Sequence, residues 1–216
     1  MQDLLIAAAT VSGLVTIASD WRGVRRPTFY VAKPLTTLLI LGLAWLSLAA
    51  WPAYRGWVMA ALGFCLAGDV ALMFHGTRAF VAGLSSFLVG HLLLIAAFAT
   101  DLPLGPLRLP PTVLAAAGIF AVAVIGYAGW LLPLAGRLKV PVTLYVAALA
   151  AMVLVALLRA ALGEGEGAWW VCGGALLFAL SDSVLAYRKF VATPWWGQPM
   201  TLLTYYAAIG LIAGAH

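Results

Sequence analysis

The sequence predicts an all-α fold, a polytopic membrane bundle of eight transmembrane helices that forms a single domain over residues 1–216. The first observation is composition, because 65% of the residues are hydrophobic and 9% are charged. A soluble domain has about 25% charged residues. The second is that the apolar residues gather in eight runs, most of them close to the roughly 20 residues that a helix needs to span a bilayer. The runs are 4–19, 34–51, 57–74, 80–99, 112–134, 141–162, 168–187 and 200–215.

Residues that interrupt helices mark most of the gaps between these runs. The first run lacks the basic flank of a cleavable signal peptide, so we expect it to be retained as a helix. The interrupting residues are, in chain order, Arg26-Pro27, Trp51-Pro52, Leu109-Pro110-Pro111, the segment 163–167, and the prolines of 193–199.

Loop charges predict the orientation of the bundle. Nine of the 12 Lys and Arg residues lie in or beside the first, third, fifth and seventh loops, and three lie near the even loops. Cytoplasmic loops carry the excess of basic residues. We therefore expect the odd loops in the cytoplasm and both termini on the non-cytoplasmic side. The nine are Arg22, Arg25, Arg26, Lys33, Arg78, Arg137, Lys139, Arg188 and Lys189.

Composition also excludes some partners. The net charge of +5 comes from loop residues, which orient the protein and meet anionic lipid headgroups rather than nucleic acid. Cys65 and Cys172 both lie inside apolar runs, so we expect buried free thiols rather than a disulfide.

Two acids interrupt the apolar runs, Asp69 in LGFCLAGDVALMF and Asp182 in GALLFALSDSVLAY. A carboxylate inside the bilayer is costly and marks a functional site by default. At 1.5 Å per residue, Asp69 is about 7 Å and Asp182 about 8 Å from the cytoplasmic end of its helix. His91 lies deeper, at roughly 16 Å. This estimate predicts one polar chamber open to the cytoplasm, provided that the third and seventh helices are neighbours. Its members are Asp69, Asp182, Tyr145, Tyr205, Tyr206 and Lys33.

The runs LAGDVALMF, FVAGLSSFLVGH, GALLFALSDSVLA and TYYAAIGLI, together with Lys33-Pro34, resemble the YhhN-like family of membrane lysoplasmalogenases. The resemblance extends from about residue 30 to 212 and implies hydrolysis of the vinyl ether bond of lysoplasmalogens. Where the family often has a tyrosine three residues after the histidine, this chain has Leu94. The matching positions are Lys33, Asp69, Phe80, Gly83, Phe87, Gly90, His91, Tyr145, Ser181, Asp182 and Tyr205.

This chemistry needs an acid that protonates carbon and a negative group beside the oxocarbenium ion that results. Paired carboxyl groups do this in glycosidases, so we expect Asp69 and Asp182 to be the catalytic pair that shares one proton. Which of them is the acid stays open. We expect seven further residues to bind the lysophospholipid, and Lys33 with Arg22, Arg25 or Arg26 to hold its phosphate. These substrate-binding candidates are Lys33, Tyr145, Ser181, Tyr205, Tyr206, His91 and Phe87.

Several other hypotheses for the roles of these residues stay open. The aspartates could be structural, capped by Ser, Tyr and Lys, or could relay protons in a transporter, and the protein could bind lipid without chemistry. The histidines are His75, His91 and His216. His91 is expected to lie too deep to join the acids in a metal site, so we expect no metal and no cofactor. We expect a location in a bacterial cytoplasmic (inner) membrane.

Overall fold

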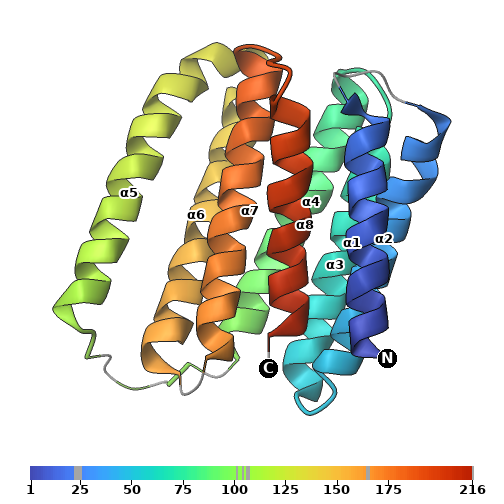
Figure 1. Ribbon diagram of the computed structural model, residues 1–216. Coiled ribbons are helices and arrows are strands. Elements are labelled where there is room, and N and C mark those ends of the chain that lie inside the picture. The colour runs from blue at the N-terminus through green and yellow to red at the C-terminus, as the bar shows by residue number, and fades with distance from the viewer. Residues whose placement is uncertain (22–25, 101, 104, 106–107, 164–165, 216) are drawn as a thin grey trace.

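The computed structural model describes residues 1–21, 26–100, 102–103, 105, 108–163 and 166–215, and in this part of the chain every regular element is a helix (Figure 1). The all-α prediction is therefore confirmed. The helices are α1 (Gln2–Ser19), α2 (Pro27–Ser47), α3 (Pro52–Leu72), α4 (Thr77–Ala99), α5 (Pro111–Leu131), the 3-10 segment η2 (Leu132–Leu138), α6 (Lys139–Leu162), α7 (Gly167–Phe190) and α8 (Gly197–Gly214).

The helices run up and down the bundle, and α1 begins at the same end as α8 finishes (Figure 1). Six segments of the described chain are long and apolar enough to cross a membrane. One of them, Pro111–Leu162, contains both α5 and α6, and α8 is not among the six. Eight crossings and the side on which the termini lie stay predictions, and Arg22 and Arg25, which helped to orient the chain, lie outside the described residues.

The second helix begins earlier than the sequence suggested. α2 starts at Pro27 rather than at residue 34, and Pro34 lies inside it. Proline is favourable at the first helical position, where its missing N–H would have no intrahelical partner. Within a membrane helix, neighbouring groups tolerate the one bond that Pro34 cannot make. Lys33 is therefore not at the start of the helix but almost two turns inside it, where it faces α3.

The contacts between helices determine which of them surround the site. α3 packs against α2 and α4, whereas α7 packs against α6 and α8. α7 and α8 approach closely at Gly174, where a side chain would not fit, since an added Cβ would lie 2.9 Å from the Ala208 carbonyl oxygen. In the described part of the chain, α3 and α7 thus do not pack extensively against each other, so the condition set for a shared chamber, that these helices are neighbours, is not met. α5 lies at the edge of the bundle and packs on α6 and η2 (Figure 1).

Candidate active site

A cavity of about 230 Å³ lies between α2, α3, α4, α7 and α8, and both Asp69 and Asp182 line it. We call it the polar cavity. It reaches the end of the bundle where α3 and α7 finish, because His75, Gly76 and Lys189 are also on its wall. The two acids therefore face one space even though their helices are not packed together. Further polar lining comes from Lys33, Ser181, Arg188, Gln198, Thr201 and Tyr205.

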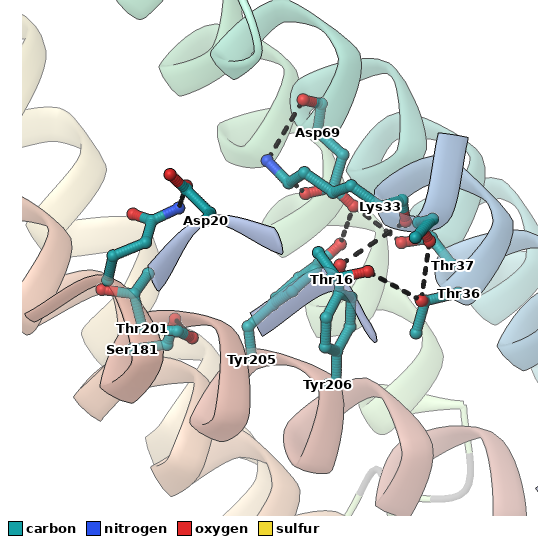
Figure 2. A network of polar contacts seen from close by, with 12 residues as sticks. Thr16, Asp20, Lys33, Thr36, Thr37, Asp69, Ser181, Thr201, Tyr205 and Tyr206 are labelled. Atoms are coloured by element: carbon teal, nitrogen blue, oxygen red, sulfur yellow. Dashed lines mark hydrogen bonds and ion pairs between the residues drawn. The ribbon is translucent and has the colours of Figure 1, made fainter. Parts of the chain in front are cut away.

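Asp69 is held by charge and by two hydroxyl groups (Figure 2). The Lys33 Nζ lies 3.2 Å from its Oδ1. Thr37 and Tyr205 each donate a hydrogen bond of 2.7 Å to its Oδ2. An ionised carboxylate only accepts hydrogen bonds, and an adjacent ammonium favours that charged form. The carboxylate of Asp69 is thus surrounded by one cation and two hydrogen-bond donors.

Asp182 has different surroundings. Tyr145 donates a hydrogen bond of 2.6 Å to its Oδ2. Among the described residues, no lysine or arginine forms an ion pair with it. The side chain is buried, with 8% exposure for the residue as a whole. A buried carboxyl group without a cationic partner favours its neutral form, so this group is suited to carry a proton.

His91 contacts Asp182, which the depth estimate did not predict. Its Nε2 lies 3.5 Å from the Asp182 Oδ2, and its ring packs edge-on against Tyr145 and Phe178. The expectation that depth keeps His91 away from both acids is therefore wrong for Asp182. α4 begins at Thr77 and α7 ends at Phe190, each three residues beyond its predicted bound at the same end of the bundle, so the contact comes from the reach of the side chains and not from a change in relative depth. His91 is fully buried behind Asp182 and does not line the polar cavity, where a substrate-binding residue would lie.

Four of the other predicted substrate-binding residues lie on the polar cavity wall, namely Lys33, Phe87, Ser181 and Tyr205. Phe87 packs edge-on against Tyr205. Ser181 uses its hydroxyl to donate a hydrogen bond of 3.0 Å to the Thr201 carbonyl oxygen, which ties α7 to α8. Tyr145 does not line this cavity and reaches it only through Asp182.

Tyr206 points away from the polar cavity. Its hydroxyl lies 3.5 Å from the Lys33 carbonyl oxygen, on the side of α8 that meets α1 and α2 (Figure 2). There it borders a buried polar cluster in which Thr36 donates a hydrogen bond of 2.9 Å to Ser12. The adjacent residues Tyr205 and Tyr206 therefore have different surroundings, and only Tyr205 belongs to the cavity.

Several residues of the site were not predicted from the sequence. Thr37 is four positions after Lys33, so both lie on one face of α2, a spacing that could have identified it. Arg188 and Lys189 were interpreted only as orienting charges, yet both line the polar cavity. Gln198 also lines the cavity, and it donates a hydrogen bond to the buried carboxylate of Asp20.

The residues predicted to bind phosphate have different surroundings, and their role stays a prediction. Lys33 points its ammonium at Asp69, and Arg26 is exposed and does not line the cavity. Arg22 and Arg25 lie outside the described residues. Arg188 and Lys189 are further basic residues on the cavity wall, and the Lys189 Nζ lies 4.6 Å from the Phe80 ring centroid.

The described residues contain no group of three or more His, Cys, Asp and Glu side chains that could hold a metal ion. His91 and Asp182 meet as a pair, but His75 is on the exposed end of the cavity. The site thus has two carboxyl groups on one cavity. Asp69 is paired with the ammonium of Lys33, and Asp182 accepts a hydrogen bond from the phenol of Tyr145.

Comparison with known proteins assigns the sequence to a family. The sequence model of the YhhN family matches residues 28–215, which includes every residue of the polar cavity. The chain belongs to the YhhN family. No solved structure matches this YhhN protein significantly.

Curated relatives are similar over much of the chain. A protein named lysoplasmalogenase from Mycobacterium bovis is 37% identical over 153 residues, 66% of this chain and 56% of the relative. The Homo sapiens protein named lysoplasmalogenase TMEM86B is 31% identical over 182 residues, 84% of this chain and 72% of the relative. The Rattus norvegicus protein of the same name is 35% identical over 156 residues, 72% of this chain and 59% of the relative. The match thus spans little more than half the length of the mycobacterial relative.

Proposed function

We propose that this protein is an integral membrane hydrolase of the lysoplasmalogenase type. It would cleave the vinyl ether bond of a lysoplasmalogen to give a fatty aldehyde and a glycerophospho-base. The observation that carries the proposal is the contrast between Asp69 and Asp182, which line one buried cavity with opposite charge environments. Membership of the YhhN family and the names of the relatives support this reaction class.

Asp182 is the acid in this mechanism. Its carboxyl proton passes to the vinyl carbon remote from oxygen, forming a C–H bond and leaving an oxocarbenium ion at the other carbon. Tyr145 donates to Oδ2 and so stabilises the carboxylate that results. Water then adds to the cationic carbon, and its surplus proton returns to Asp182. The hemiacetal collapses with breakage of the bond to the glycerol oxygen, which takes up the proton that the hemiacetal hydroxyl loses.

Asp69 is the anion that stabilises the cation. Because Lys33, Thr37 and Tyr205 hold its carboxylate in place, no reorganisation is needed when positive charge develops on the substrate. This division assigns the two roles that the sequence left open. His91 lies beside Asp182, with its Nε2 3.5 Å from Oδ2, but does not line the cavity.

The headgroup would lie at the open end of the polar cavity. Arg188 and Lys189 supply the positive charge there, and charge-assisted hydrogen bonds from such groups to phosphate are strong. We assign this end to the cytoplasmic side of a bacterial inner membrane, in a bundle of eight crossings, because basic residues gather in the loops at that end.

The proposal is tested with purified full-length protein in detergent. A lysoplasmalogen with an ethanolamine headgroup is supplied, with and without a chelator, beside a control lysolipid whose ether chain is saturated. We expect equal amounts of aldehyde and glycerophosphoethanolamine from the vinyl ether, none from the control, and no effect of the chelator. Absence of aldehyde with the wild-type protein would overturn the proposed function, and loss of turnover on chelation would overturn the metal-independent mechanism.

A further inference from the structure

A second cavity, of about 330 Å³, adjoins the site on the other side of Asp182. It lies between α5, α6 and α7, and we call it the apolar cavity because most of its wall is aliphatic or aromatic. Asp182, Phe80 and Leu185 line both cavities. The carboxyl group therefore stands at the boundary between a charged space and a hydrocarbon-lined one.

The residues of the apolar cavity lie on both sides of the level of Asp182 along the helices. At that level, Tyr145 donates to its carboxyl group, and Tyr127 of α5 donates a hydrogen bond of 2.6 Å to the Ser183 carbonyl oxygen. From this level the cavity extends toward Leu131, Val142 and Phe190 in one direction, and in the other direction toward the start of α7 and the end of α6. Its far end is formed by Phe120, Ala150 and Leu176. At 1.5 Å per residue, these lie about 7 to 10 Å from the Asp182 level.

We propose that the apolar cavity holds the single hydrocarbon chain of the lysolipid, with Ala150 limiting the depth to which that chain is accommodated. A dry apolar cavity of about 150 Å³ accommodates benzene, and this one is about twice that size. A molecule that is charged at one end and aliphatic at the other matches the two adjoining cavities, and the bond between its parts would lie beside Asp182. This inference rests on the proposed function for the identity of the reacting bond.

The test uses Ala150→Phe, which fills the far end of the apolar cavity. The matched control is Ala147→Phe on the same helix, because Ala147 is exposed and does not line the cavity. Phe120→Ala is the opposite change, since it enlarges the far end. Each variant is compared on saturated ether lysolipids with hexyl or decyl chains, because an extended decyl chain reaches the far end of the cavity and a hexyl chain does not. Their dissociation constants are measured in detergent, and aldehyde release is measured with the corresponding hexenyl and decenyl lysoplasmalogens.

We expect Ala150→Phe to weaken binding and kcat/KM for the long chain by about tenfold, with the short chain unaffected, because pocket contacts discriminate by chain size. Ala147→Phe should change neither, and Phe120→Ala should retain the long chain. Equal effects of Ala150→Phe on both lengths, or none on either, would overturn the chain pocket. If the wild type releases no aldehyde but the binding pattern holds, the proposed function fails while the chain pocket stands.

Discussion

Lys33 crosses from α2 to α3 and pairs with Asp69, its Nζ lying 3.2 Å from the carboxylate Oδ1 and 3.2 Å from the Asp69 carbonyl oxygen. The two side chains are only 6% and 2% exposed. Removing one partner of such a buried pair leaves the other charge uncompensated, whereas removing both relieves it. Stability and catalysis can therefore be separated at this pair.

Asp69→Asn alone should destabilise the protein by about 3–5 kcal/mol, because Lys33 stays charged and buried. The double variant Lys33→Met/Asp69→Asn should recover most of that stability but remain impaired in turnover, because the anion beside the substrate is absent. Thermal unfolding in detergent and aldehyde release measure the two effects. If the recovered double variant turns over like the wild type, Asp69 has no catalytic role.

Gly68 allows the aromatic wall of the polar cavity to pack beside Asp69. A Cβ at this position would lie 2.6 Å from the Phe87 ring, and that ring is itself packed against Phe178 and Tyr205. We expect Gly68→Ala to lower stability by about 1–3 kcal/mol through overpacking. Gly63→Ala on the same helix is the control, because nothing lies within 4 Å of its added Cβ. Equal melting temperatures for the two variants would rule out this packing constraint.

The headgroup assignment predicts a change in binding rather than in chemistry. Lys189→Gln should raise KM for a lysoplasmalogen several-fold with kcat unchanged, the pattern for loss of an interaction made equally in ground and transition states. Arg78→Gln provides the comparison, since Arg78 is exposed and does not line the polar cavity. An unchanged KM for Lys189→Gln would mean that the phosphate is held elsewhere.

The sequence predicted the helices well because apolar runs of membrane length have few alternative structures. It also pointed to Asp69 and Asp182, which line one cavity in the structure, since a carboxyl group inside an apolar run is energetically costly. The start of α2 was misplaced because Pro34 was treated as a boundary, although Pro27 is the residue that begins the helix. The depth estimate did not anticipate the contact of His91 with Asp182, because the reach of the two side chains was not available from the sequence.

Lateral arrangement was beyond sequence reasoning. Nothing in the spacing of Tyr205 and Tyr206 indicates that one bonds Asp69 and the other lies toward Lys33 on the α1 side. Helix rotation decides this, and it is set by packing against several neighbours at once. For the same reason, the apolar cavity between α5, α6 and α7 could not be anticipated from periodicity, because α5 is apolar on nearly every face.

The central claim is that Asp182 donates the proton to the vinyl carbon. The most direct measurement is kcat for aldehyde release by Asp182→Asn, with Asp3→Asn as the control because Asp3 is exposed at the start of α1. Loss of a general acid lowers the rate by about 10²–10⁴-fold, so we expect a fall of that size with binding of the saturated ether lysolipid unchanged. The Asp3→Asn variant should keep wild-type turnover. Full turnover by a folded Asp182→Asn protein would contradict the account.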